Sequence, residues 1–311
     1  MVDKILLAKP RGFCAGVERA IGIVEKALKD YGPPIYVRHK IVHNDYVVDS
    51  LKAKGAVFVE ELSEVPDGSN VIFSAHGSAP NVRTEAKNLG LNFFDAVCPL
   101  VAKVHSEAAS YAEKRYSIIY IGHKKHQEAK GTTGQVNPHQ VHVVETVQDV
   151  ENIHVVDPQR VAYLTQTTLS VYDTAEIIAA LQAKFPEIKS PLKQDICYAT
   201  TNRQEAIQTL ARQCQLVLVI GDEQSSNSKR LRETAERYCK SFLISDREKI
   251  DEKWFENVTA VGITSGASVP EELVRGVVDL ILSKNRNASV EDVTFQDEKI
   301  FFPIPEEIKF I

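Results

Sequence analysis

Short apolar runs alternate along this chain with longer segments in which apolar side chains recur at helical spacing. Alternation of this kind is typical of an α/β fold. The apolar runs are nearly continuous, which favours parallel strands in a sheet that helices cover on both faces. The pattern predicts strands over residues 4–9, 34–39, 70–75, 117–122, 141–146, 160–165, 215–221 and 259–264, and helices over 16–32, 99–115, 169–185, 201–213, 226–239 and 270–284.

The layout of these elements has a threefold rhythm, although no residue-level repeat accompanies it. Cys14, Cys98 and Cys197 each follow a strand-like run and precede a predicted helix. After each cysteine a second predicted strand runs into a polar cluster, at 74–80, 121–128 and 220–230. Three similar α/β lobes around a shared centre would bring these ends together. We therefore predict lobes over residues 1–97, 98–196 and 197–285, followed by an extended arm over 286–311.

Composition narrows the possible partners. The chain has 311 residues, of which 43% are hydrophobic, enough for a substantial core. It carries 37 basic and 42 acidic side chains, and the resulting net charge of -5 gives no general attraction to nucleic acid or to an anionic membrane. Any bound anion must be held by local donors. The amino terminus lacks the apolar segment of a signal peptide and no stretch reaches the length of a bilayer span, so we expect a cytoplasmic protein.

The cysteines suggest a metal site. Five cysteines in a chain without a secretory signal argue against a disulfide framework. Cys14, Cys98 and Cys197 each stand just before a predicted helix, where unpaired N–H groups and the helix dipole favour a thiolate. Three thiolates would leave one iron of a four-iron cluster open to a substrate. Zinc ligation and burial as a small hydrophobic residue are the alternatives, and burial is expected for Cys214 and Cys239.

Polar side chains recur where predicted strands end and helices begin, the positions at which backbone N–H groups point toward an anion. Imidazoles and hydroxyls can hold a diphosphate and can exchange protons, although each could instead be structural or cap a helix. Glu128 could pass protons if burial raises its pKa. Of Thr167 and Thr168, one is expected to cap the next helix, and the other could bond a substrate hydroxyl. The candidate anion ligands are His43, His76, His126, Ser225, Ser226, Asn227 and Ser268.

Nine motifs, in order between about residues 10 and 284, resemble the 4-hydroxy-3-methylbut-2-enyl diphosphate reductase family, which catalyses the last step of the methylerythritol phosphate route to isoprenoids. They include PRGFCAGVERAI, AVCPLVAKVH, TQTTLS and SSNSKRL. The resemblance implies three α/β lobes in pseudo-threefold arrangement around a central 4Fe-4S cluster. It also implies Cys14, Cys98 and Cys197 as the cluster ligands. The implied diphosphate ligands are His43, His76, His126, Thr168, Ser225, Ser226, Asn227 and Ser268.

The resemblance further implies a reductive dehydroxylation that yields isopentenyl and dimethylallyl diphosphates. Glu128 would donate the proton, assisted by Thr167 and His126, and ferredoxin or flavodoxin would supply the electrons. The chain departs from the family at Gln127, where proline is common, and at Lys40 and Ala102. Loss of the proline removes a fixed φ beside Glu128 and puts the placement of its carboxyl in question. A zinc-dependent hydrolase and a non-catalytic phosphate-ligand binding protein are the competing hypotheses.

Overall fold

A computed structural model describes residues 2–311 and divides the chain into two compact units. The first unit comprises Met1–Val17, His43–Val47 and Tyr198–Phe301. The second unit comprises Glu18–Val42, Val48–Cys197 and Phe302–Ile311. Both units consist of parallel sheets with helices, as the alternating pattern predicts, so the α/β class is confirmed. Among the helices of residues 2–311, none combines the length and the apolar composition required to cross a bilayer.

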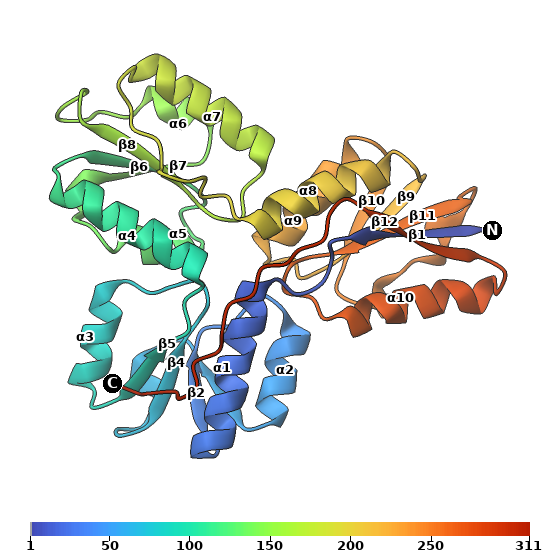
Figure 1. The fold of residues 1–311 in the computed structure, drawn as a ribbon, viewed down its shortest axis with the longest axis horizontal. Coiled ribbons are helices and arrows are strands. Elements are labelled where there is room, and N and C mark those ends of the chain that lie inside the picture. The colour runs from blue at the N-terminus through green and yellow to red at the C-terminus, as the bar shows by residue number, and fades with distance from the viewer. Residues whose placement is uncertain (1) are drawn as a thin grey trace. The chain divides into compact units, whose positions relative to one another are not determined.

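The first unit contains one five-stranded sheet in the order β10-β9-β11-β1-β12, with every neighbouring pair parallel. Helices α8 and α9 lie on one side of this sheet and α10 on the other (Figure 1). The strands are β1 (Lys4–Lys9), β9 (Leu216–Ile220), β10 (Lys240–Ile244), β11 (Ala260–Ser265) and β12 (Ser289–Thr294), and the helices are α8 (Tyr198–Ala211), α9 (Ser226–Glu236) and α10 (Glu271–Lys284).

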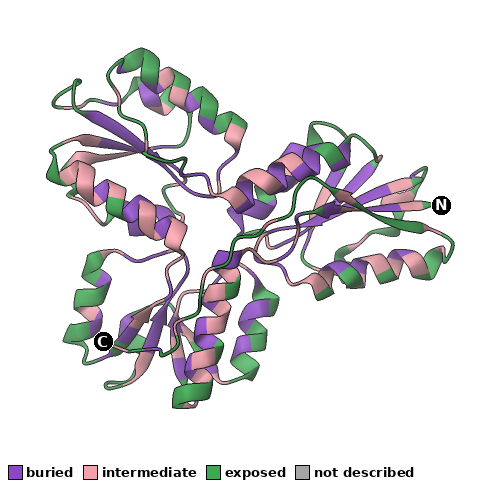
Figure 2. Cartoon of the chain, viewed as in Figure 1, coloured by how far each residue is buried: buried purple, intermediate pink, exposed green. Residues whose placement is uncertain are grey.

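Strand β9 shows why its sequence is apolar throughout. Leu216, Leu218 and Ile220 pack in the core on the α10 side, whereas Val217 and Val219 pack in the core that α8 and α9 cover. Successive side chains of a strand point to opposite faces, so a sheet covered on both faces needs apolar residues at every position. The buried residues therefore concentrate in the strands and on the inward helix faces (Figure 2).

The second unit contains two parallel sheets, in the orders β3-β2-β4-β5 and β7-β6-β8. Their strands are β2 (Ile35–Arg38), β3 (Ala56–Val59), β4 (Asn70–Phe73), β5 (Asn92–Asp95), β6 (Ser117–Ile121), β7 (Val141–Val144) and β8 (Val161–Thr165). The helices that belong wholly or mostly to this unit are α1 (Ala15–Tyr31), α2 (Asp45–Ala53), α3 (Pro80–Asn88), α4 (Pro99–Glu113), α5 (Gln127–Thr133), α6 (Val147–Glu151) and α7 (Val171–Lys184).

The structure distributes the chain differently from the predicted boundaries at 97, 196 and 285. Strand β1 pairs with β11 and β12, so the first strand of the predicted lobe 1–97 belongs to the sheet of residues 216–294. Residues 289–294 of the predicted arm form β12 and extend that sheet. A parallel strand finds its neighbours across a long crossover, and local periodicity does not report which strands become neighbours.

The last ten residues do form an arm, and it packs within the second unit. Ile308 is completely buried. The backbone N–H of Ile311 donates to the carbonyl of Phe93 at 3.0 Å, and that of Phe93 donates to the carbonyl of Ile311 at 3.2 Å. The ring of Phe310 meets that of Tyr31 edge to face, with centroids 5.1 Å apart. The carboxyl terminus thus covers the open edge of β5.

Candidate active site

Glu128 and Thr167 form the best-defined polar pair of the second unit. Glu128 lies in the first turn of α5 and is 2% exposed. Its Oε1 accepts a hydrogen bond from the Thr167 backbone N–H at 2.6 Å, and its Oε2 accepts one from the Thr167 hydroxyl at 2.9 Å. Thr167 follows β8, and α5 follows β6. Adjacent parallel strands therefore bring the two residues to the same edge of the sheet.

Burial raises the pKa of Glu128 to about 7. The two hydrogen bonds from Thr167 oppose this rise because they favour the carboxylate, and the nearby charge of Asp195 adds to it. A carboxyl group with this pKa holds its proton near neutral pH and can still release it, as a general acid requires.

Turnover is expected to fall as the pH rises above about 7, because the protonated Glu128 then becomes the minority form. Below that pH the acid form predominates, and Glu128 should not limit the rate. The measurement is the pH dependence of kcat for the wild-type enzyme, with Glu128→Asp for comparison. A rate that stays constant from pH 6 to pH 9 would show that no group of this pKa supplies a proton in the slow step.

His76 and His126 lie next to each other in the second unit. Their rings meet edge to face with centroids 5.8 Å apart. His126 caps α5, and its Nδ1 accepts a hydrogen bond from the Glu128 N–H at 3.2 Å. An accepting Nδ1 assigns the proton of the neutral ring to Nε2, which leaves Nε2–H as a donor. Gln127 occupies the first position of α5, so the helix begins there without a proline.

Gln166 is a site residue that the sequence analysis missed. Its side chain is completely buried between the two strand ends. Its Nε2 donates to the Thr168 hydroxyl at 2.8 Å, and its Oε1 accepts from the His123 N–H at 3.0 Å. The amide thus positions Thr168, one of the predicted anion ligands. The only signal in the sequence was a polar side chain directly after the buried strand.

The first unit holds the remaining predicted anion ligands. Ser225 caps α9, and its Oγ accepts from the Ser228 N–H at 3.3 Å. Asn227 is 5% exposed, and neither its Nδ2 nor its Oδ1 has a hydrogen-bond partner within the described chain. A buried amide without a partner is costly unless a ligand satisfies it. The hydroxyl of Ser268 donates to the carbonyl of His43 at 3.0 Å, so these two predicted residues also lie together.

All three predicted ligand cysteines precede helices, as expected. Cys98 is the N-cap residue of α4, and its thiol does not cap the helix. Cys197 directly precedes α8, and its N–H donates to the Thr167 carbonyl at 3.0 Å. Cys14 directly precedes α1. Burial raises the pKa of the Cys14 thiol, and the charge of Arg203 and the N–H groups of the first helical turn oppose this rise.

Cys14 belongs to the first unit, and Cys98 and Cys197 belong to the second. Among residues 2–311, neither unit by itself contains three His, Cys, Asp or Glu side chains grouped so as to hold a metal ion. The donor chemistry nevertheless fits an iron-sulfur cluster, because each thiol stands at a helix N-terminus where a thiolate is stabilised. Their ligand role stays a prediction.

The other two cysteines, for which the sequence analysis expected burial, are partly buried. Cys214 and Cys239 both pack against the core between the sheet and helices α8 and α9. The thiol of Cys214 lies 3.3 Å from the carbonyl oxygen of Leu210, and hydrogen bonding to Cys239 raises its pKa. Cys214, held in the protonated form, is therefore a poor metal ligand, whereas the same hydrogen bond lowers the pKa of Cys239.

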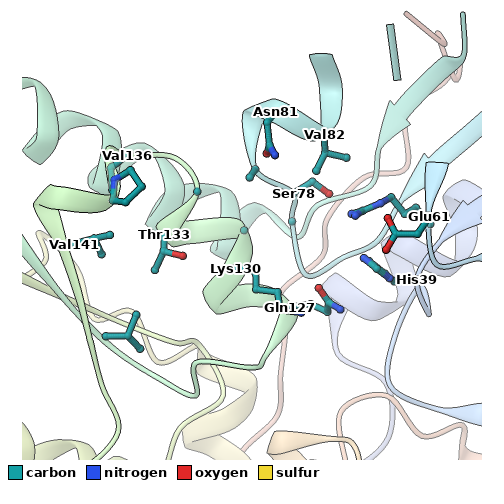
Figure 3. A pocket seen from close by; sticks show the side chains of 17 residues that line it. His39, Glu61, Ser78, Asn81, Val82, Gln127, Lys130, Thr133, Val136 and Val141 are labelled. Carbon is teal, nitrogen blue, oxygen red and sulfur yellow. The ribbon is translucent and has the colours of Figure 1, made fainter. Parts of the chain in front are cut away.

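A hollow of about 780 Å³ lies beside this site in the second unit (Figure 3). Gln127 and Lys130 line it from α5, and Ser78 lines it from the loop before α3. His126 and Glu128 do not line it. The hollow is therefore a neighbour of the proton-transfer pair and does not contain it.

Related proteins place the chain in a family. The LytB protein family matches residues 5–282. A 4-hydroxy-3-methylbut-2-enyl diphosphate reductase of Aromatoleum aromaticum is 55% identical over 311 residues. The alignment covers 99% of this chain and 99% of the reductase. The reductase of Actinobacillus succinogenes is 52% identical, with 98% of each chain covered.

Solved structures agree. The structure of E-1-hydroxy-2-methyl-but-2-enyl-4-diphosphate reductase from Plasmodium falciparum has a TM-score of 0.93 at 40% identity, and covers 99% of this chain and 96% of its own. A second solved structure is that of (E)-4-hydroxy-3-methyl-but-2-enyl diphosphate reductase, the terminal enzyme of the non-mevalonate pathway. It has a TM-score of 0.64 at 31% sequence identity, and the alignment covers 91% of this chain and 100% of that chain.

Parallel sheets, candidate anion ligands at strand ends and a buried glutamate with a pKa of about 7 are features of an α/β enzyme. Cysteines at helix N-termini are the candidate ligands of a metal centre. The particular group within this class is also clear, because both the match over residues 5–282 and the identity of 55% cover nearly the whole chain. This chain belongs to the LytB protein family.

Proposed function

We propose that this chain reduces (E)-4-hydroxy-3-methylbut-2-enyl diphosphate to isopentenyl and dimethylallyl diphosphates, as the last step of the methylerythritol phosphate pathway. Support comes from the reductase activity for which its relatives are named and from their likeness over the whole chain. The observation that carries the proposal is the buried Glu128 carboxyl, held by Thr167 and titrating at about 7. Such a group can protonate a leaving hydroxyl at neutral pH.

The proposed roles follow from the chemistry of each side chain. The N–H and O–H groups at strand ends bind the diphosphate and fix its orientation. Glu128 gives its proton to the hydroxyl, which leaves as water, and the Thr167 hydroxyl holds both the substrate oxygen and the carboxyl in place. His126 orients Glu128 through the backbone N–H. The diphosphate ligands are His43, His76, His126, Thr168, Ser225, Ser226, Asn227 and Ser268.

A 4Fe-4S cluster held by Cys14, Cys98 and Cys197 completes the proposed site. When bound, it supplies the two electrons of the reduction, with one iron free of protein ligands. The reaction consumes two electrons and two protons and releases one water. A small electron carrier such as ferredoxin or flavodoxin would provide the electrons, and we expect the reaction to take place in the cytoplasm.

Anaerobic purification tests this function against zinc hydrolysis. The wild-type protein is expected to be brown, to contain four irons and four sulfides per chain as a 4Fe-4S cluster requires, and to convert the diphosphate when a chemical reductant is supplied. Mössbauer spectra should show that the substrate perturbs one iron site only. A colourless protein that contains zinc and is inactive with reductant would favour the hydrolase, and full activity without iron would rule out the proposed cofactor.

A further inference from the structure

Arg203 and Glu298 form a buried ion pair in the first unit that the proposed reaction does not use. The side chain of Arg203 is completely buried and that of Glu298 is 14% exposed. Nη1 of Arg203 lies 2.9 Å and 3.1 Å from the two carboxylate oxygens of Glu298. Asn202 also donates to this carboxylate, at 3.0 Å. A buried charge is expensive to maintain, so a paired arginine in a core calls for a physical reason.

The same guanidinium holds the loop that carries Cys14. Nη2 of Arg203 donates to the carbonyl of Gly12 at 2.8 Å. Gly12 has a φ of +75°, and its N–H donates to the hydroxyl of Ser265 at 2.8 Å. The N–H of Cys14 itself donates to the carbonyl of Ala267 at 3.1 Å. The backbone of the loop that carries Cys14 is therefore held by hydrogen bonds at Gly12 and at Cys14 itself. Arg203 is the charged partner among these contacts.

The two charges of the ion pair have opposite signs and lie beside the Cys14 loop. Arg203 contacts the backbone two residues before Cys14, and Glu298 contacts Arg203. A positive charge stabilises negative charge on a nearby group, and burial weakens the screening by solvent. The balance between the two charges thus sets the local potential at this sulfur.

We propose that the Arg203–Glu298 pair positions Cys14 and sets the reduction potential of the iron-sulfur cluster that this cysteine binds. The inference rests on the proposed function, because it assumes that Cys14 is a cluster ligand. Reduction adds negative charge to the cluster. Arg203 makes that addition easier, and Glu298 limits the effect. Charge and hydrogen bonding to the sulfurs are among the factors that set such potentials.

Two substitutions that break the same ion pair distinguish the effect of charge on the reduction potential from the effect of losing the pair's contacts. Glu298→Gln leaves the charge of Arg203 uncompensated and should raise the potential. Arg203→Met leaves the charge of Glu298 uncompensated and should lower it. The double variant is neutral again and should return close to the wild-type potential although the pair is gone. We expect each single variant to change the equilibrium constant for one-electron reduction about tenfold, which corresponds to about 59 mV.

The matched control lies next to Glu298 in the segment that follows β12. Asp297 pairs with Lys9 at 2.8 Å and its side chain is 61% exposed, so solvent screens its charge. Asp297→Asn should leave the potential unchanged. Arg203→Lys keeps the charge but loses the guanidinium that contacts both Glu298 and Gly12, and should keep the potential closer to that of the wild type than Arg203→Met does.

Spectroelectrochemical titration of the anaerobic proteins gives the potentials, and thermal melting checks the fold. Opposite shifts in the two single variants, with recovery in the double variant, support the proposal. Shifts of the same sign, or equal shifts for Glu298→Gln and Asp297→Asn, overturn it. If Arg203→Met does not hold a cluster, the comparison of Glu298→Gln with Asp297→Asn decides alone. A wild-type protein that binds no cluster would instead refute the proposed function.

Discussion

Cys98→Ser is expected to yield a colourless protein without reductase activity. The proposed site has three thiolate ligands, and a serine hydroxyl is a poor replacement because it is harder and far less acidic than a thiol. The fold should survive, because Cys98 is the N-cap residue of α4 and serine is among the best N-cap residues. Iron and sulfide analysis, the visible spectrum and the reductase assay measure the loss, while circular dichroism monitors helix content and melting.

Cys239→Ser is the matched control for this substitution. Cys239 packs against the core of the first unit beside Cys214, so serine there should cost some stability through burial of a hydroxyl. Its cluster content and its rate should equal those of the wild type. If Cys98→Ser keeps its iron and its rate, Cys98 is not a ligand of the cluster.

Glu128→Gln is expected to lower kcat by about 10²- to 10⁴-fold, the usual contribution of a general acid. The cluster and the affinity for the substrate should be retained, because glutamine has the same shape. Its carbonyl oxygen can still accept from the Thr167 N–H, and its NH2 group can donate to the Thr167 hydroxyl. Pre-steady-state kinetics with a reduced cluster measure the step directly, and the dissociation constant of the diphosphate serves as the control.

Stability provides a second test of Glu128. Its pKa is raised from 4.5 in the unfolded chain to about 7 in the folded protein, so the folded state binds more protons between these values. This contribution to stability is complete below pH 4.5 and is lost as the pH rises through about 7. Glutamine does not titrate. The difference in Tm between Glu128→Gln and the wild type should therefore increase in favour of the variant from pH 5 to pH 8, and a constant difference would contradict the raised pKa.

Local sequence pattern was enough to predict the class of fold and the location of the candidate chemistry. The apolar run of β9 and the helical spacing of α8 and α10 are properties of neighbouring residues, and they set strand and helix with little help from the rest of the chain. The position of Cys98 before Pro99 identified a helix N-terminus in the same way. The strand ends that carry Glu128 and Thr167 can therefore be located from the order of the amino acids alone.

Contacts between distant residues were decided only by the tertiary structure. Strand β1 joined β11 and β12 because parallel neighbours are set by packing, and Gln166 became a positioning residue through a contact with His123, 43 residues earlier. The pair of Arg203 and Glu298 spans 95 residues, and neither side chain carries a local signal of its partner. The raised pKa of Glu128 likewise depends on burial. The sequence by itself determined the order and type of the elements because those depend on adjacent side chains, and the tertiary structure decided partners, burial and charge balance because those depend on residues that meet only after folding.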